Sequence, residues 1–446
     1  MLTSQMFSTF LDNLKIPNER QKNIARHYRV ITKNLNKEFR DIDDGQMNRL
    51  KVGSAGRRTA IKNTSDLDML YIMKPSSRPE YDEGENPQRR ILRDVKESLR
   101  TSFPNQEIKV DRLVVQIIFN SFHIEVQPVF ENEDGSFEFP DSYDNGRWRL
   151  TKPRLEIDEM RRFRKNKSKN LHPLCRMLRA WKNRNSVHMG GLLIDTLAWR
   201  FLNQTERFDN AGLVSYGLMC KDFFEYLKNQ EHQPHYKALG SRQDVKVYKN
   251  FNKSARRAFE LCEQAIEAHE NGKEKKSHEL WRKVFGSAFP LHEALNEDSV
   301  KSLDSTSHTA KAWRDTEEFP DDKFDDIDIR YPLEIVCTVK QNGFMDKPLW
   351  KYLEELTRRK LPLSKKLFFS LDRKQLDSIA GDYHIYWKIL NRGEVAKSKD
   401  RIRGQINLGN ITHTETTDFH GDHKVWCYVV QDNIVIATAN IKIPIE

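Results

Sequence analysis

The sequence predicts an α+β protein with a β-sheet near the N-terminus, a helical lobe in the middle and a small β-sandwich at the C-terminus. Three observations support this prediction. Strand-like runs occupy much of residues 50–130, helical periodicity dominates residues 153–290, and short strands with turn signals recur from residue 367 onward. A chain of 446 residues is also long enough for about three domains.

The first forty residues are expected to be helical and to brace the sheet that follows. A break at Pro17 separates two helical runs, the second of which continues to residue 39. The first run has apolar residues at helical spacing: Phe7, Phe10, Leu11 and Leu14. Residues 74–90 are rich in Pro, Gly and charge and predict a surface loop, which precedes a helix at 91–100.

A small turn followed by two acidic residues is the most informative pattern in the sequence. The Gly53-Ser54 turn lets backbone N–H groups approach phosphate oxygens closely, and the Ser54 hydroxyl adds a donor. Asp66 and Asp68 lie in an alternating run, which predicts a strand with both carboxylates on one face and Leu67 on the other. Such a face can hold Mg²⁺.

Two-metal phosphoryl transfer usually needs a third carboxylate. Glu125 is the best candidate because it lies in a second alternating run, SFHIEVQPVF, in which Pro128 ends the pattern. Asp111 is the alternative, but the segment around it continues in apolar residues and favours a structural strand of the same sheet. Each motif alone is common in turns and solvated strands, whereas the ordered set favours catalysis.

These motifs resemble a known family. GSAGRRTAIKNTSDLDML and HIEVQP are similar to polymerase-β-type nucleotidyltransferases of the oligoadenylate synthetase and cyclic GMP-AMP synthase group, and most closely to the bacterial CD-NTases (the SMODS family). LCRMLRAWKNRN, HMGGLLIDTLAWRFL and WRKVFGSAFP resemble further parts of the synthase domain. IYWKILNRGEVA, RGQI, HTETTDFHGDHKVWCYVV and IATANIKIPI resemble the adenylyl/guanylyl and SMODS C-terminal sensor-type domain. The resemblance implies a polymerase-β-like nucleotidyltransferase sheet with a helical lobe, then a small β-rich domain.

The resemblance also implies roles for individual residues. The catalytic, metal-binding carboxylates would be Asp66, Asp68 and Glu125, and the nucleotide-binding residues would be Gly53, Ser54 and Lys182. Glu125 stands where many relatives have Asp. On the helix after Lys182, Gly191 replaces a Ser that many relatives carry and Asp195 supplies the acid, so this chain departs from the family pattern for a donor contact there.

The activity that the resemblance implies is a Mg²⁺-dependent nucleotidyl transfer, with Mn²⁺ as a substitute. Nucleoside triphosphates would be joined into a cyclic or linear oligonucleotide second messenger with release of pyrophosphate. The implied setting is bacterial antiphage (CBASS) signalling, with a downstream effector and regulatory proteins as partners. Two alternatives stay open: a nucleotidyltransferase that modifies RNA or protein, and a non-catalytic RNA- or nucleotide-binding sensor of the same fold.

The composition is consistent with these expectations. A net charge of +10 favours polyanionic ligands, although a solvated basic surface explains it equally. Five widely spaced cysteines without a C-x-x-C motif predict reduced core thiols rather than a zinc ribbon or a disulfide framework. The sequence has no apolar run of membrane-spanning length and no secretory signal, so we expect a cytoplasmic protein without a membrane partner.

The predicted domain boundaries follow shifts in composition. The nucleotidyltransferase sheet with its bracing helices takes residues 1–150, the helical lobe 151–290, a polar and acidic linker 291–328, and the sensor-type domain 329–446. In the last domain a helix at 347–360 precedes strands with turns at 391–393 and 431–433.

Several further residues have two interpretations. Base stacking by Trp181 and Tyr216 is less favoured than core packing. The basic run either follows a phosphate backbone or forms a solvated helix face: Arg161, Arg162, Arg164, Lys165, Lys167 and Lys169. A metal site in the C-terminal domain is less favoured than polar strand-edge and turn chemistry for His413, Glu415, His420 and His423.

Overall fold

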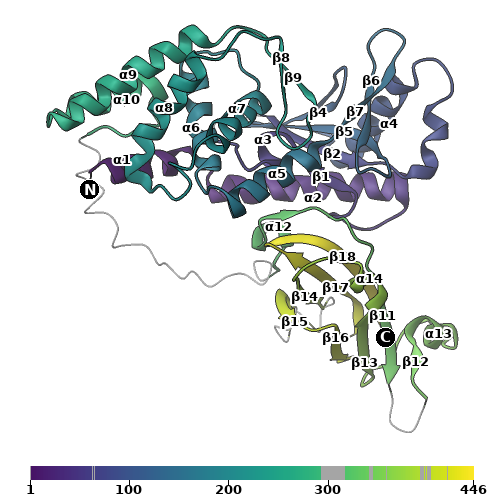
Figure 1. Cartoon of the computed structure of the whole chain (residues 1–446). Coiled ribbons are helices and arrows are strands. Elements are labelled where there is room, and N and C mark those ends of the chain that lie inside the picture. The colour runs from purple at the N-terminus through teal and green to yellow at the C-terminus, as the bar shows by residue number, and fades with distance from the viewer. Residues whose placement is uncertain are drawn as a thin grey trace. The chain divides into compact units, whose positions relative to one another are not determined.

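The computed structural model describes residues 2–62, 64, 66–292, 317–340, 345–357, 359–391, 396, 398, 403–418 and 420–446. The chain forms two compact units (Figure 1). The first contains residues 1–24, 30–43 and 50–305, and the second contains residues 25–29, 44–49 and 306–446.

The two N-terminal helices, α1 (Leu2–Leu14) and α2 (Asn18–Arg40), flank Pro17 as the sequence predicts. They pack on different layers of the first unit. Asn36 of α2 accepts a hydrogen bond from the Tyr71 hydroxyl (3.3 Å), and Arg40 donates to the Ile72 carbonyl (3.0 Å), so α2 braces the sheet. Phe7 of α1 instead belongs to the core of the helical lobe. The expectation that both helices brace the sheet is therefore wrong for α1. The apolar side of α1 packs into the hydrophobic core of the helical lobe instead.

A seven-stranded sheet forms the other half of the first unit, with the order β1-β2-β5-β4-β3. Its strands and short helices have these bounds: β1 Arg49–Lys51, α3 Gly53–Gly56, β2 Asp66–Ile72, η1 Pro75–Ser77, η2 Pro79–Tyr81, β3 Glu107–Val110, β4 Val115–Ile118, β5 His123–Glu131, β6 Phe137–Asp141 and β7 Arg147–Thr151. Strands β2 and β5 are parallel, β4 runs antiparallel to β5, and β6 and β7 extend from the far end of β5. This order places β2 beside β5 although about fifty residues separate them.

Helix α4 (Pro87–Ser102) begins four residues before the predicted helix at 91–100, inside the predicted surface loop at 74–90. Asn86 caps it by accepting from the Arg89 backbone N–H (3.0 Å), and Pro87 occupies its first turn, where no backbone donor is needed. The apolar stripe of α4 is buried: Ile91, Leu92, Val95 and Leu99.

The helical lobe contains six main helices and a small hairpin. Their bounds are α5 Pro153–Asn166, α6 Leu171–Arg184, α7 Gly191–Asn203, η3 Leu213–Ser215, α8 Tyr216–Lys228, β8 His235–Lys237, β9 Asp244–Lys246, α9 Asn252–Glu270 and α10 Glu274–Phe285. Residues from all of these helices share one hydrophobic core, in which Trp181 is 1% exposed. A left-handed Gly272 (φ 71°) marks the turn between α9 and α10.

The second unit contains two sheets. The five-stranded sheet has the order β10-β18-β17-β14-β15, and the four-stranded sheet has the order β12-β11-β13-β16. The bounds are α12 Pro320–Lys323, β10 Asp326–Ile327, β11 Ile335–Lys340, β12 Lys347–Pro348, α13 Leu349–Glu354, β13 Lys366–Leu371, α14 Arg373–Asp377, β14 His384–Leu390, β15 Arg403–Gly409, β16 Thr412–Thr416, β17 Gly421–Gln431 and β18 Ile434–Ile445. Side chains of both sheets share one core, including Phe369 and Trp387.

Details of the second unit refine the sequence predictions. The turn expected at 431–433 joins β17 to β18, with Asp432 (φ 50°) and Asn433 (φ 64°) both left-handed, as a tight hairpin turn requires. The predicted turn at 391–393 lies mostly outside the described residues. The helix expected at 347–360 is shorter, because α13 ends at Glu354. Residues 317–328 of the predicted linker include α12 and β10, and β10 pairs with β18.

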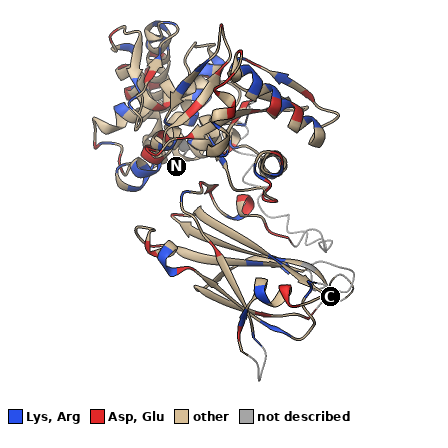
Figure 2. Cartoon of the chain, turned by 90° about the vertical axis from the view of Figure 1, so that its right-hand side faces the viewer, with Lys and Arg blue, Asp and Glu red and all other residues tan. Residues whose placement is uncertain are grey.

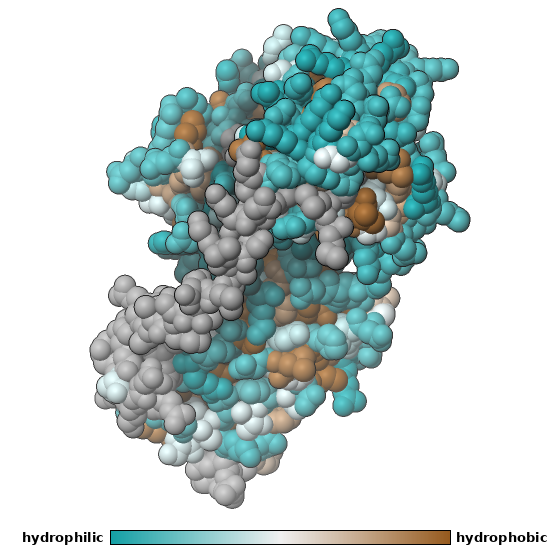
Figure 3. Space-filling model, turned by 90° about the vertical axis from the view of Figure 1, so that its left-hand side faces the viewer, coloured by the Kyte–Doolittle hydropathy of each residue, from teal (hydrophilic) through white to brown (hydrophobic). Residues whose placement is uncertain are grey.

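The surface and the thiols are as the composition predicts. In Figure 2, ribbon segments of Lys and Arg are interspersed with segments of Asp and Glu, and the face of the first unit in Figure 3 is largely hydrophilic. All five cysteines are free and buried. Among the described helices, none has the length and apolar character needed to cross a membrane.

Candidate active site

Three predicted site residues lie on the adjacent parallel strands β2 and β5. Asp66 is in register with His123, and Asp68 is in register with Glu125, so all four side chains share one face of the sheet. Leu67 points to the opposite face and is 2% exposed. The alternation in the sequence therefore placed both aspartates correctly, and β-sheet pairing brings Glu125 to them.

The Asp68 carboxyl has an unusual environment. Burial, followed by the nearby Glu125 charge, raises the pKa of Asp68 to about 6, while the Arg57 charge opposes the shift. Glu125 itself accepts a hydrogen bond from the Gln116 side chain on β4 (2.8 Å). Two carboxylates that crowd one half-buried position repel each other, and a cation bound there would relieve this repulsion.

His123 is a member of the site that sequence reasoning did not assign. Its Nε2 lies 3.2 Å from Asp66 Oδ1 and 3.6 Å from Glu125 Oε1. The signal was present, because His123 is two residues before Glu125 in an alternating strand and must share its face.

The Gly53-Ser54 turn lies directly against Asp68. It follows β1, and the Val52 backbone N–H donates to the Asp68 carbonyl (3.1 Å). Gly53 adopts a left-handed conformation (φ 61°), and a Cβ at this position would lie 1.8 Å from Asp68 Oδ2. Only glycine allows this close approach. The Ser54 carbonyl accepts from the backbone N–H groups of Thr59 (2.9 Å) and Ala60 (3.1 Å), which closes the loop after α3.

Lys182 lies near the C-terminal end of α6. Its charge interacts with the sheet face that carries Asp66, Asp68 and Glu125, which we call the acidic face. Burial and the Arg179 charge lower its pKa, while the Asp66 charge raises it. A half-buried amine whose charge interacts with that of Asp66 is suited to contact a negatively charged ligand.

Asp195 has a different position from the residues that face β2 and β5. Its side chain is completely buried and accepts from Arg57 Nε (2.9 Å) and from two nitrogens of Arg179 (2.6 and 2.9 Å). The Gly191 carbonyl also accepts from Arg179 (3.2 Å). The departure from the family pattern on α7 is thus accompanied by an internal ion-pair cluster.

Other candidate residues lie away from this face or already have partners. Asp111 is exposed in the turn after β3. Trp181 and Tyr216 pack in the helical core, as the favoured interpretation has it. In the basic run, Arg161, Arg162 and Lys167 pair with acidic side chains, which favours a solvated helix face.

The residues considered for a metal site in the C-terminal domain also bond to one another or to neighbours. Glu415 contacts His413 (2.7 Å) and Arg403 (2.6 Å), and His423 contacts the Asn391 side chain (3.1 Å). These contacts are the polar chemistry favoured by the sequence.

The acidic face suits a hard divalent cation. Within the described residues, no group of three or more His, Cys, Asp and Glu side chains is arranged so that it could hold an ion as it stands. Asp66 is instead turned toward His123. Asp68 and Glu125 nevertheless present carboxylate oxygens at a position where negative charge is unfavourable, and oxygen ligands are those that Mg²⁺ prefers. The chemistry of these donors therefore suits the ion, although the described side chains are not arranged around it.

A mixed sheet with paired carboxylates on adjacent strands, a close glycine turn and a flanking helical lobe defines a nucleotidyltransferase. Residues 1–163 match the Second Messenger Oligonucleotide or Dinucleotide Synthetase domain (SMODS), and residues 314–446 match the Adenylyl/Guanylyl and SMODS C-terminal sensor domain. The chain therefore carries a SMODS-type nucleotidyltransferase domain near its N-terminus and a sensor-type domain at its C-terminus.

Individual proteins also resemble this chain, with low sequence identity to it. A probable cyclic nucleotide synthase of Bacillus cereus (strain VD146) is 23% identical over 277 residues, which covers 54% of this chain and 82% of that protein. The structure of Escherichia coli MS115-1 CdnC with HORMA-deltaN has a TM-score of 0.49 at 16% identity and covers 64% of this chain and 98% of its own. Bradyrhizobium diazoefficiens CdnG with GTP has a TM-score of 0.47 at 9% identity and covers 67% and 97%.

Proposed function

We propose that this nucleotidyltransferase joins nucleoside triphosphates into a cyclic or linear oligonucleotide second messenger, with Mg²⁺ as its cofactor. The observation that carries the proposal is the register pairing of Asp68 with Glu125 beside the Gly53 turn. This arrangement supports a phosphate chain held at the turn and a reacting hydroxyl near the carboxylates. The bacterial relative named as a probable cyclic nucleotide synthase supports the product class.

Two groups of residues in the chain would have different roles in this reaction. Gly53, Ser54 and Lys182 would bind and orient the donor triphosphate, and Asp66, Asp68 and Glu125 would hold the divalent ions. Mg²⁺ supplies Lewis-acid stabilisation of phosphate oxygens and lowers the pKa of an acceptor hydroxyl. The acceptor ribose oxygen bonds to the α-phosphorus while the bond from that phosphorus to the bridging oxygen breaks. Pyrophosphate leaves, and the Glu125 carboxylate helps to accept the hydroxyl proton.

The remaining chain would serve this reaction. We propose that residues 1–150 and 151–290 form the synthase and that the part of the chain from residue 317 onward, which begins with α12 and β10, acts as a sensor domain. The product would activate a separate effector in bacterial antiphage (CBASS) signalling in the cytoplasm. The match to a C-terminal sensor domain supports a regulatory role for the second unit.

Product analysis tests the proposal. The purified full-length chain is incubated with each labelled nucleoside triphosphate and with mixtures, with Mg²⁺ or with chelator, and phosphatase-resistant products are resolved by chromatography and mass spectrometry. We expect an oligonucleotide made by the wild type and by Asp111→Asn, but not by the Asp66→Asn, Asp68→Asn double variant. A labelled RNA or protein instead of an oligonucleotide would identify a modifying transferase. A product made equally by the double variant would contradict the proposed site.

A further inference from the structure

A buried cluster of charged side chains lies behind the Gly53-Ser54 turn. Arg57 follows α3 directly, and its side chain is 7% exposed. Its guanidinium contacts Asp195 (2.9 Å) on α7 and Glu156 (3.4 Å) on α5. Arg179 of α6 holds the same Asp195 with two hydrogen bonds. Two helices of the lobe, α5 and α7, therefore contact the Arg57 side chain directly, and α6 supports it through Asp195.

Asp195 is the centre of this cluster. Besides the two arginines, the Thr59 hydroxyl donates to Asp195 Oδ2 (3.2 Å), so the carboxylate anchors the loop at two positions. Although burial raises its pKa, the charges of Arg179 and Arg57 hold the pKa of Asp195 well below its ordinary value. A buried carboxylate stays ionised only with such compensation, and removing one partner leaves an unpaired charge in the interior.

The cluster is connected to the acidic face by the short loop itself. The Arg57 backbone N–H donates to the Gly53 carbonyl (3.2 Å), and Gly53 in turn packs against Asp68. The Arg57 charge also reaches Asp68, where it opposes the effect of Glu125. A change in the position of Arg57 should therefore either displace the Gly53-Ser54 turn or alter the electrostatic potential at Asp68.

We propose that Asp195 and Arg179 are positioning residues that fix Arg57, and that Arg57 fixes the Gly53-Ser54 turn against Asp68 for a metal–nucleoside triphosphate. Asp195 thus acts on the donor nucleotide indirectly, through the loop. This inference deepens the proposed function and rests on it. It also gives α7 a role without the serine that many relatives carry at Gly191.

Binding measurements test the inference without turnover. Mn²⁺ binding with a non-hydrolysable nucleoside triphosphate is followed by electron paramagnetic resonance, and amide exchange of residues 53–60 is followed by mass spectrometry. We expect Arg57→Gln and Asp195→Asn each to weaken Mn²⁺–nucleotide binding by about tenfold or more, as for residues that orient metal ligands. Exchange should rise in residues 53–60 while peptides from α8 and α9 keep wild-type exchange.

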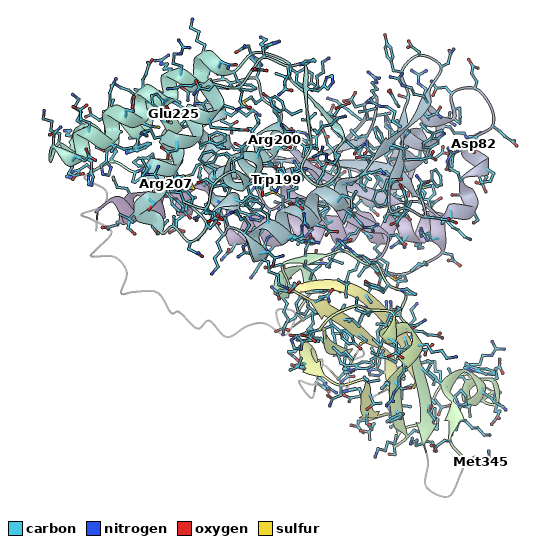
Figure 4. The ribbon with its side chains drawn as sticks, viewed as in Figure 1. Asp82, Trp199, Arg200, Arg207, Glu225 and Met345 are labelled. Carbon is cyan, nitrogen blue, oxygen red and sulfur yellow. The ribbon has the colours of Figure 1, made fainter. Side chains whose placement is uncertain are left out.

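Conservative and matched variants separate positioning from stability. Arg57→Lys keeps the charge but cannot contact Asp195 and Glu156 as a guanidinium does, so it should restore part of the affinity. The matched control is the ion pair of Arg207 with Asp222 (2.7 Å) in the same lobe, where Figure 4 labels Arg207. Arg207→Gln and Asp222→Asn should leave both readouts unchanged. If Asp195→Asn does not fold, Arg179→Lys and Arg57→Lys provide the test.

The outcomes are distinct. If Arg57→Gln and Asp195→Asn fold and bind Mn²⁺–nucleotide within about twofold of the wild type, the inference is overturned, because a tenfold effect is expected of an orienting residue. Additive losses in the Arg57→Gln, Asp195→Asn double variant would also overturn it, since one shared pathway predicts a loss no larger than that of the single variants. A wild type that binds nucleotide in this manner but makes no oligonucleotide would refute the proposed function alone.

Discussion

Asp68 and Glu125 are register partners on parallel strands, and burial together with the Glu125 charge raises the pKa of Asp68 to about 6. The sheet thus places two carboxylates where their mutual repulsion is costly in the absence of a cation. In the proposed function, the Gly53 turn and Lys182 would supply the complementary groups for a triphosphate. This relationship is the basis of the predictions that follow.

Divalent-cation binding should depend on pH through Asp68. Its pKa is raised in the folded protein, so a proton competes with the cation at pH values below about 6. We expect the apparent Mn²⁺ affinity to fall as pH is lowered through this value. Titrations of Mn²⁺ at several pH values, with Asp68→Asn as the comparison, measure the effect. An affinity that is constant from pH 7 to pH 5 would argue against Asp68 as a ligand.

The same shift predicts how the metal-free protein responds to pH. The pKa of Asp68 is about 6 in the folded protein, whereas the ordinary pKa of an aspartate is 3.8. The contribution of Asp68 to folding stability is therefore most favourable at low pH and is lost as pH rises from about 4 to 6. The change is on the order of 2 to 3 kcal/mol at 1.4 kcal/mol per pKa unit. Denaturant titrations of the wild type and Asp68→Asn across this range measure it, and identical pH profiles would contradict it.

Gly53→Ala should disable the site without unfolding the protein. The new methyl group would occupy the space of Asp68 Oδ2, and the left-handed backbone disfavours alanine. A displacement of about 1 Å at reacting groups costs roughly a hundredfold in rate, so we expect a loss of about that size in nucleotide incorporation. Gly212→Ala, where a Cβ meets nothing within 4 Å, is the matched control and should retain wild-type rates.

His172 should make the first unit acid-sensitive. Burial and the charges of Arg176, Arg164 and Arg58 lower its pKa to about 3, so it stays neutral when folded. In the unfolded chain His172 takes up a proton below its ordinary pKa of 6.5. The free energy of unfolding should therefore fall as pH drops from about 6.5 toward 3. Unfolding free energies of His172→Asn should show a shallower decline over this range. An equal decline in both proteins would exclude His172 as the cause.

Phe7 should anchor α1 in the helical lobe. Its ring is fully buried, 5.3 Å from Trp281 and 5.5 Å from Phe289 between centroids. Phe7→Ala should lower the free energy of unfolding by about 3 to 5 kcal/mol, as for other buried phenylalanines. Urea titration measures the loss, and Val214→Ala, at a side chain that is 65% exposed, is the control. A loss below about 1 kcal/mol would mean that α1 does not depend on this contact.

The sequence is sufficient where its signal is local. Alternation in residues 66–72 correctly places Asp66 and Asp68 on one face, and Asp432 and Asn433 mark a hairpin because few residues tolerate left-handed conformations. The spacing of Phe7 and Phe10 likewise predicts a helix. The strand at 335–340 was missed, although its exposed and buried residues alternate.

Long-range pairing is what the sequence does not reveal. Arg57 and Asp195 are 138 positions apart, and no periodic pattern links them. The apolar stripe of α1 predicts burial but not the partner, which is the helical lobe. The family pattern identified Asp195 only as the acid on the helix after Lys182, and its partners inside the lobe, Arg57 and Arg179, come from the structure. Burial and partner identity depend on tertiary packing, which local rules do not specify.

The most direct test of the central claim is incorporation of an α-labelled nucleoside triphosphate into phosphatase-resistant product, with pyrophosphate release measured in parallel. Wild type and Asp111→Asn should form both products in equal amounts with Mg²⁺, and Asp68→Asn and Glu125→Gln should form neither above background. Equal incorporation by wild type and Asp68→Asn would contradict the assignment of nucleotidyl transfer to the face that Asp68 and Glu125 share.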